Sequence, residues 1–415
     1  MPFDANKFYL GANIGWINGA YRHDLGRAFM KYSPSTPPPD HRYPPSDPRH
    51  DQEFYKIIKA YFTHLSFRNI KVVRMWLLEG LEGMSFVGAS YKRVSKLDKF
   101  SLDNYSTYVE PRIKIIMNEA QRYHIQVYWC LLDAAWLTNE DDMKNNPWYR
   151  LLLKHLVENA GASFKYDILL PFLGTIKPFK TNVFAIDIAN EVDWIWRKKI
   201  MGMGRSTVVS FVHDVYNFIA GYLPSPDRYY CTASFASHNE LMKPVTSQQE
   251  KVDFLDFYDC HRYFDPAAPA NSDHGHLPKW LSSKACVIGE AGHKYYGNVT
   301  KMVDETKQAT SSKTLMDEAL AKDYTGVLLW RYAPVGDGHR LLKLTKGDTG
   351  NVSYPDTVLS SFLTGFKAAA AKAAAAMVTP GTPIPSGQDP FTDYERPIWR
   401  QIQPFVSTIP LSRRP

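Results

Sequence analysis

Eight short, β-rich apolar runs alternate with amphipathic stretches along this 415-residue chain, and the alternation limits the folds available to it. Near-continuous hydrophobic runs are typical of parallel strands that are covered on both faces. Eight repeats favour an α/β fold closed into a (β/α)8 TIM barrel, although an open doubly wound sheet would show the same alternation. The predicted strands cover residues 8–16, 70–78, 125–133, 183–191, 229–235, 255–263, 285–291 and 326–332.

The segments between these runs predict the helices and loops. Apolar residues recur at helical spacing in residues 51–66, 103–123, 205–221, 304–322 and 356–377. Residues 17–50 and 264–284 are long loops that would lie on the catalytic face of a barrel. We predict a barrel domain over residues 1–378, a Pro/Gly-rich linker over 379–390 and a tail over 391–415 that packs back on the barrel.

Composition disfavours several classes of partner. The net charge of +7 arises from 49 basic and 42 acidic residues, and no long basic run indicates a nucleic-acid surface. No apolar run of 18 residues is present, so no membrane-spanning helix is expected. The first residues lack the features of a secretory signal, so the protein is either cytoplasmic or begins after a removed signal. We expect a monomer.

The sequence also carries no motif for a cofactor. Gly-x-Gly-x-x-Gly loops, Walker-type loops and a serine nucleophile elbow are absent. His274 and His276 lack a third ligand at convincing spacing, so no metal is expected there. The four cysteines lie inside strand-like segments and are predicted to be buried free thiols. We therefore expect chemistry that needs no cofactor.

Polar residues stand near the ends of several predicted strands, where barrel enzymes place their active sites. They are Arg74 on strand two, Asn190 and Glu191 on strand four, His261 and Tyr263 on strand six, Glu290 on strand seven and Trp330 on strand eight. A charge inside an apolar strand is costly unless it is paired. Arg74 and Glu290 are therefore expected to be partners.

Glu191 and Glu290 are the candidate catalytic residues, because strands four and seven lie on opposite sides of a barrel mouth. A protonated carboxyl can assist a departing glycosidic oxygen while an ionised one attacks the anomeric carbon. A separation of about 5–5.5 Å would mean retention of configuration. Arg74 beside Glu290 is expected to lower the pKa of that carboxyl by about 1–3 units.

This ordered set of residues resembles clan A of the glycoside hydrolases, and family 5, which includes cellulases and β-mannanases, is most similar. The resemblance covers roughly residues 8–335 and rests on Arg, Asn-Glu, His-x-Tyr, Gly-Glu and Trp on successive strands. Two positions depart from the family pattern. Val192 follows the Asn-Glu pair where proline is common, and Leu132-Asp133 ends strand three without the usual His or Asn.

The resemblance implies a role for each residue of the set. Glu191 would be the acid/base, Glu290 the nucleophile, Asn190 a ligand of the substrate 2-hydroxyl, Arg74 and Tyr263 the groups that orient the nucleophile, His261 a pocket residue and Trp330 the floor of a sugar subsite. It implies a retaining β-glycoside hydrolase that acts on an oligo- or polysaccharide.

Other interpretations of these residues stay open. The two glutamates could form structural ion pairs, and the other strand-end residues named above could be packing residues of the core. A further set of residues could either pack in the core or contact substrate: Asp133, Asp187, Trp129, Trp136, Trp194, Trp196 and His293. The chain could also be a non-catalytic glycan-binding barrel, a transglycosylase on the same scaffold or an unrelated barrel enzyme with a carboxylate base. Glucan, mannan, galactan and xylan are all compatible with the scaffold, as are endo and exo action.

Overall fold

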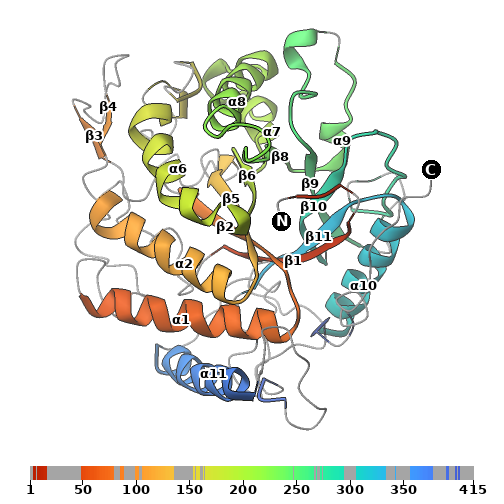
Figure 1. The fold of residues 1–415 in the computed structure, drawn as a ribbon. Coiled ribbons are helices and arrows are strands. Elements are labelled where there is room, and N and C mark those ends of the chain that lie inside the picture. The colour runs from red at the N-terminus through yellow and green to blue at the C-terminus, as the bar shows by residue number, and fades with distance from the viewer. Residues whose placement is uncertain are drawn as a thin grey trace.

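The fold of the chain is given by a computed structural model (Figure 1). The described residues are 3–5, 7–15, 48–78, 85–87, 99–101, 105–134, 153–154, 156–158, 162, 164–245, 247–265, 268, 272, 274–293, 305–332, 342, 356–376, 389–391, 398–399 and 401. The loop 17–47, most of the predicted linker and the sites of several other sequence-based expectations, Trp136 among them, lie outside these ranges.

The barrel wall consists of parallel strands. They are β1 (Tyr9–Ile14), β2 (Val72–Leu78), β5 (Gln126–Leu132), β6 (Val183–Asp187), β7 (Cys231–Thr232), β8 (Ser234–Phe235), β9 (Tyr258–Phe264), β10 (Cys286–His293) and β11 (Gly326–Leu329). Each of the eight predicted strands coincides with one of them, or with the β7–β8 pair. A separate antiparallel hairpin, β3 (Ser85–Val87) and β4 (Lys99–Ser101), was not predicted.

Closure of the sheet into a barrel depends on residues 231–235. β7 pairs with β6, while β8 pairs with β9, and only Ala233 separates the two short strands. One continuous segment thus joins both ends of the strand order β7-β6-β5-β2-β1-β11-β10-β9-β8. The prediction of a closed (β/α)8 barrel is confirmed, and the open doubly wound sheet is excluded.

Helices surround this wall (Figure 1). The longer ones are α1 (Pro48–Phe67), α2 (Glu110–Arg122), α6 (Leu170–Ile176), α8 (Arg205–Ala220), α10 (Glu305–Ala321) and α11 (Asp356–Ala376). Short helical segments are η1 (Tyr105–Val109), η2 (Phe164–Leu169), η3 (Lys177–Asn182), α7 (Asp193–Arg197), η4 (Ile200–Gly202), α9 (His238–Leu241) and η5 (Gln248–Glu250). The η2–α6–η3 unit escaped sequence analysis because Pro171, Gly174 and Pro178 interrupt its helical pattern.

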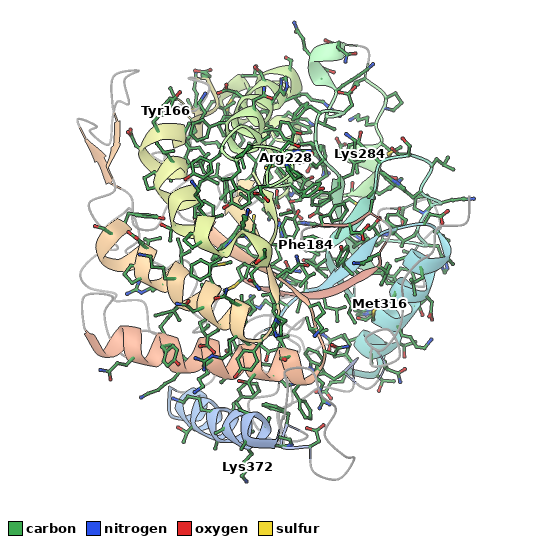
Figure 2. The ribbon with its side chains drawn as sticks, in the orientation of Figure 1. Tyr166, Phe184, Arg228, Lys284, Met316 and Lys372 are labelled. Atoms are coloured by element: carbon green, nitrogen blue, oxygen red, sulfur yellow. The ribbon has the colours of Figure 1, made fainter. Side chains whose placement is uncertain are left out.

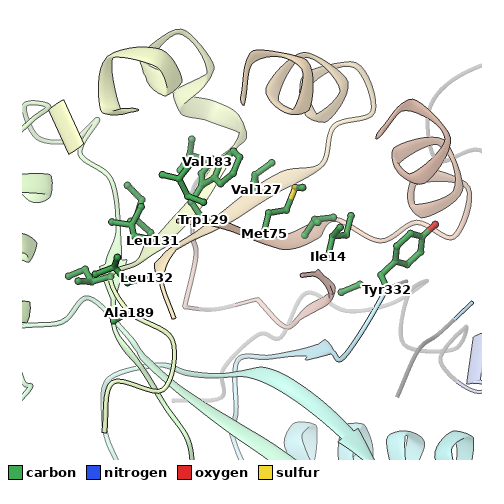
Figure 3. Close-up of a cluster of buried hydrophobic side chains, with 14 of the residues drawn as sticks. Ile14, Met75, Val127, Trp129, Leu131, Leu132, Val183, Ala189 and Tyr332 are labelled. Atoms are coloured by element: carbon green, nitrogen blue, oxygen red, sulfur yellow. The ribbon is translucent and has the colours of Figure 1, made fainter. Parts of the chain in front are cut away.

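Two hydrophobic clusters lie on the two sides of the wall. The outer cluster packs strands against helices, and Figure 3 shows Met75, Val127 and Trp129 among its members. The inner cluster contains Phe3, Tyr9, Val72, Tyr128, Phe184, Ala185, Phe257, Ala285, Val287 and Leu328. Figure 2 shows Phe184 in the middle of the molecule.

Several members of the inner cluster, such as Tyr9 and Val72, stand at the first residue of their strand. Along β9 the inward positions run from Phe257, just before the strand, through Asp259 to His261. Inward positions of a strand recur at every second residue, so the inward face of β9 changes from apolar to polar along its length. The apolar inner cluster and the charged group around Glu290 therefore lie at different levels of the barrel interior.

The carboxyl-terminal residues that are described pack against α1 and α11. The ring centroid of Phe391 lies 4.4 Å from that of His64 and 5.2 Å from that of Phe366. Trp399 lies 5.1 Å from His64 and 6.1 Å from Tyr332. Among the described helices, none has the length and apolarity needed to cross a bilayer.

Candidate active site

Glu191 and Glu290 meet at the carboxyl ends of the strands. Glu290 lies within β10, whereas Glu191 follows β6, and one oxygen of each lies within 4.8 Å of the other and of a nitrogen of His261. Both carboxyl groups are largely shielded, because the side chain of Glu290 is 5% exposed and that of Glu191 is 15% exposed. The remaining exposure leaves Glu191 the more accessible of the two.

Glu290 is held by three neighbours. Its Oε1 accepts a hydrogen bond from Arg74 Nη1 at 2.9 Å, and its Oε2 accepts one from the Tyr263 hydroxyl at 2.8 Å. His261 Nδ1 lies 3.5 Å from Oε2. The contact with Arg74 that the sequence predicted is present. A buried cation and a hydroxyl donor both stabilise the ionised form of this carboxyl.

Glu191 has different partners. Its Oε1 lies 2.9 Å from His261 Nδ1, and its Oε2 accepts a hydrogen bond from the indole Nε1 of Trp194 at 2.7 Å. Trp194 belongs to α7, directly after the glutamate, and its contact with Glu191 was not predicted. Within the part of the chain that the structure describes, the Glu191 carboxyl is bonded by an imidazole and an indole, neither of which is a permanent cation.

The strand before Glu191 ends earlier than predicted, and Glu191 itself has an unusual backbone conformation. The predicted strand ran to residue 191, but β6 ends at Asp187, and Glu191 has φ +50°, a left-handed conformation that is uncommon for a residue with a side chain. The Ser234 hydroxyl accepts a hydrogen bond from the Glu191 N–H at 3.1 Å. The next N–H, of Val192, donates to the carbonyl of Ser234 at 3.0 Å. Proline at 192 could not make that bond.

Arg74 connects the two sides of the site. Its side chain is fully buried, and its Nη2 donates to Asp187 Oδ2 at 2.6 Å and to the side-chain amide oxygen Oδ1 of Asn190 at 2.8 Å. Its Nη1 reaches Glu290. The sequence predicted one carboxylate partner for Arg74, but the guanidinium bridges two, Asp187 and Glu290. Asp187 also accepts from the Ser234 hydroxyl at 2.9 Å, so this aspartate is a buried hydrogen-bonding group.

Burial dominates the electrostatics of the pair and corrects one expectation. Desolvation raises the pKa of Glu290 above its ordinary value, and His261, Arg74 and the Tyr263 hydrogen bond only oppose that rise. The net lowering that Arg74 was expected to produce is therefore wrong. Desolvation likewise raises the pKa of Glu191, against the hydrogen bond from Trp194 and the charge of Arg74. Burial lowers the pKa of His261 to about 4, so this imidazole is uncharged near neutral pH.

Asn190 and Trp330 complete the set drawn from the sequence. Asn190 is 4% exposed and donates through Nδ2 to Asp133 at 3.0 Å, in addition to its bond from Arg74. Trp330 follows β11, and its ring centroid lies 5.4 Å from that of Trp76. The guanidinium of Arg74 lies 4.3 Å from the Trp76 centroid. Trp330 thus joins the site through Trp76, a residue that sequence analysis missed.

Three histidines outside this cluster, His274, His276 and His293, have structural partners. His274 Nδ1 lies 3.0 Å from the carbonyl oxygen of Tyr263, and His276 contacts Glu318. His293 lies 2.9 Å from the Ser311 hydroxyl. Among the described residues, Glu191, His261 and Glu290 form the one group with metal-ligating atoms in reach of one another. The contacts of these three with each other, with Arg74 and with donor side chains fit proton chemistry. All four cysteines are buried and free, as predicted.

These features define a (β/α)8 barrel with a buried pair of carboxyl groups at the carboxyl ends of its strands. No protein-family model and no curated protein match the sequence.

Solved structures do resemble the chain. The β-mannanase of the blue mussel Mytilus edulis is 16% identical, with 91% of this chain and 94% of that chain covered and a TM-score of 0.49. The β-1,4-mannanase of the sea hare Aplysia kurodai is 16% identical, with 78% and 88% covered and a TM-score of 0.49. The β-1,4-D-mannanase of Cryptopygus antarcticus is 13% identical, with 92% and 95% covered and a TM-score of 0.47.

Proposed function

We propose that this chain is a retaining β-glycoside hydrolase that cleaves β-linked oligo- or polysaccharide by double displacement. The observation that carries the proposal is the separation of the carboxyl groups, since one oxygen of Glu191 and one of Glu290 lie within 4.8 Å. Inverting enzymes place a water between the reacting groups and hold the carboxyls about 6.5–9.5 Å apart, whereas retaining enzymes hold them about 5–5.5 Å apart. The short separation favours direct attack by a carboxylate.

The partners of each carboxyl support the assignment of roles. Glu290 receives the Arg74 guanidinium and the Tyr263 hydroxyl, which suit an ionised nucleophile. Glu191 contacts Trp194 and an uncharged His261 and is the more exposed, which suits a group that exchanges protons with substrate and water. We therefore assign Glu290 as the nucleophile and Glu191 as the acid/base.

In the first displacement, an oxygen of Glu290 forms a bond to the anomeric carbon as the glycosidic bond breaks. Glu191 gives its proton to the departing oxygen. In the second displacement, Glu191 takes a proton from a water whose oxygen attacks the same carbon, and the ester bond to Glu290 breaks. Water is consumed, and both carboxyls return to their initial states.

Two further residues would contact the sugar. Asn190 uses its amide oxygen for Arg74 and donates one Nδ2 hydrogen to Asp133, so its second amide hydrogen would bond the 2-hydroxyl. A hydrogen bond to that hydroxyl strengthens as the transition state forms. Trp330 would present its ring to the sugar under attack. Within the described residues, this is the arrangement by which the barrel mouth would hold a pyranose.

The stereochemical outcome tests the proposal. The first product released should be the β anomer, because two displacements at one carbon restore its configuration. We would first find a substrate in a panel of aryl β-glycosides and of glucan, mannan, galactan and xylan. Proton NMR of the earliest product then reports the anomer before mutarotation. The α anomer as first product would show inversion, and no turnover on any substrate would contradict hydrolysis.

Replacing Arg74 with methionine should move the acidic limb of the pH–rate profile to higher pH. The reaction needs ionised Glu290, and Arg74 opposes the rise in the pKa of Glu290 that burial causes. Without the cation that pKa rises further, by about 1–3 units. The limb is read from kcat/KM against pH on the same aryl β-glycoside. An unchanged limb with normal turnover would show that Arg74 only packs.

Arg74→Lys is a second variant for this test, in case Arg74→Met does not fold. Arg74→Met leaves Asp187 buried without its cation, and breaking such a pair can cost about 3–5 kcal/mol of stability. Arg74→Lys keeps the charge but not the planar fork that reaches two carboxylates. It should fold and place the acidic limb between those of the wild type and the methionine variant.

A further inference from the structure

The strand that carries Glu290 contains one extra residue beside it. Along β10, Ile288 pairs with Cys260 and Glu290 with His261, so two steps on β10 correspond to one step on β9. The same excess appears on the other side, where the three steps from Ile288 to Ala291 match two steps on β11. This is a β-bulge, and the extra residue lies immediately before or at the proposed nucleophile.

The bulge decides which way Glu290 faces. Val287 belongs to the inner cluster and Ile288 to the outer one, so strict alternation would turn Gly289 inward and Glu290 outward, toward the helices. The extra residue turns Glu290 inward as well, while Ala291 returns to the outer cluster. A regular strand with this sequence would therefore place the carboxyl outside the barrel.

Two buried side chains hold the peptide groups of Gly289. Its N–H donates to Asp259 Oδ1 at 3.0 Å, and its carbonyl oxygen accepts from Asn13 Nδ2 at 2.8 Å. Asp259 and Asn13 are both fully buried and reach the peptide from β9 and β1. A buried peptide group that loses its partner costs about 1–3 kcal/mol, so these two bonds stabilise the bulge against a regular strand.

Each of these side chains is fixed in turn. The Tyr128 hydroxyl donates to the other oxygen of Asp259 at 2.6 Å. Asn13 accepts through Oδ1 from Arg74 Nη1 at 3.2 Å, the same nitrogen that binds Glu290. The peptide of Gly289 and the carboxyl of Glu290 are thus held by one connected set of hydrogen bonds.

Glycine at 289 is required by the approach of Asp259. A Cβ at this position would lie 2.2 Å from Asp259 Oδ1 and 2.3 Å from Oδ2, which is far inside contact distance. Only a residue without a side chain allows the carboxyl to come so close to the backbone.

We propose that Asn13 and Asp259 are positioning residues, which hold the Gly289 peptide and so direct the carboxyl of Glu290 toward Glu191. The inference rests on the proposed hydrolysis, because only that reaction requires Glu290 to be positioned as a nucleophile. Neither contacts the reacting atoms. Burial raises the pKa of Asp259, and its two oxygens accept the hydrogen bonds from the Gly289 N–H and the Tyr128 hydroxyl.

The test compares variants that keep or remove the hydrogen bond to Gly289. Asp259→Asn keeps an uncharged acceptor for the N–H, whereas Asp259→Val is similar in size and has none. Asn13→Leu removes the donor on the other side of the peptide. Thr232→Val is the matched control, since Thr232 is fully buried and its hydroxyl bonds the Phe257 carbonyl at 2.8 Å, away from Gly289.

We expect Asp259→Val and Asn13→Leu to lower kcat by about 100-fold with KM changed less than about threefold, because a displacement near 1 Å can have that effect. Their acidic limbs should shift to higher pH as Glu290 loses its donors. Asp259→Asn should restore most of kcat and the wild-type limb, and Thr232→Val should leave both unchanged. Circular dichroism and thermal melting verify the fold of each variant.

Normal kcat and an unchanged limb in folded Asp259→Val or Asn13→Leu would overturn the inference. So would Asp259→Asn if it were as impaired as Asp259→Val. If Asp259→Val does not fold, Asn13→Leu still decides. The wild type's turnover tests the proposed function separately. Should it be inactive, carboxyl carbon NMR of labelled glutamate still tests the positioning, because the pKa of Glu290 should rise in Asn13→Leu and stay unchanged in Thr232→Val.

Discussion

Replacing Glu290 with glutamine should reduce turnover by about 10⁵-fold or more while the protein stays folded. An amide has nearly the size of the carboxyl and can keep contacts with Arg74 and Tyr263, but it cannot form the ester with the sugar. Losing a nucleophile abolishes nearly all catalysis that depends on it. The measurement is kcat on the best substrate found for the wild type, with circular dichroism as the check on folding.

A surface glutamate provides the control for this change. Glu110 lies on α2, forms an exposed pair with Lys114 at 2.6 Å and has a side chain that is 31% exposed. Glu110→Gln should keep wild-type kcat, because exposed pairs of this kind contribute little. If folded Glu290→Gln kept more than about one hundredth of the wild-type rate, Glu290 would not be the nucleophile.

Replacing Glu191 with alanine should reduce turnover by about 10²–10⁴-fold, and the loss should depend on the leaving group. Substrates with acidic leaving groups need little protonation, so their first displacement should stay fast. Alkyl glycosides and polysaccharides need the proton and should lose most activity. The measurement compares kcat/KM for aryl β-glycosides whose leaving groups differ in pKa.

Adding azide as an external nucleophile distinguishes the role of Glu191 from that of Glu290. In Glu191→Ala the ester to Glu290 still forms, and azide can attack it from the side that the alanine has opened, so the product should be the β-glycosyl azide. In Glu290→Ala, azide would take the place of the nucleophile and attack once, so the α-glycosyl azide is expected. The reverse pattern of azide products would exchange the roles of the two glutamates. An equal loss of activity on all leaving groups in Glu191→Ala would show that Glu191 is not the acid/base.

The fold could be predicted from the sequence because its dominant signal is local. Each strand buries both of its faces, so it appears as an apolar run such as residues 285–291, and helices such as α8 show their period of 3.6. The unit over residues 164–182 was missed, because turns of different helix types replace one regular period there. The short β3–β4 hairpin was missed because three-residue strands carry too few side chains to show a pattern.

The site was predicted where a polar residue interrupted an apolar strand. Arg74 and Glu290 stood out in this way, and the structure pairs them at 2.9 Å. Asn13 and Asp259 are also polar residues in apolar strands, so the same signal could have identified them. Trp76 and Trp194 gave no such signal, because an aromatic residue in an apolar stretch is equally compatible with packing.

The sequence by itself determined the alternation of elements and the residues that a barrel would gather at its mouth, because side-chain chemistry and spacing are properties of the chain. Tertiary structure alone decided the sharing of Arg74 between Asp187 and Glu290, the rise in pKa of both glutamates and the inward direction of Glu290. Those features depend on distances between strands that are remote in sequence, on the exclusion of water and on one extra residue in β10. Burial and register exist only once the barrel has closed.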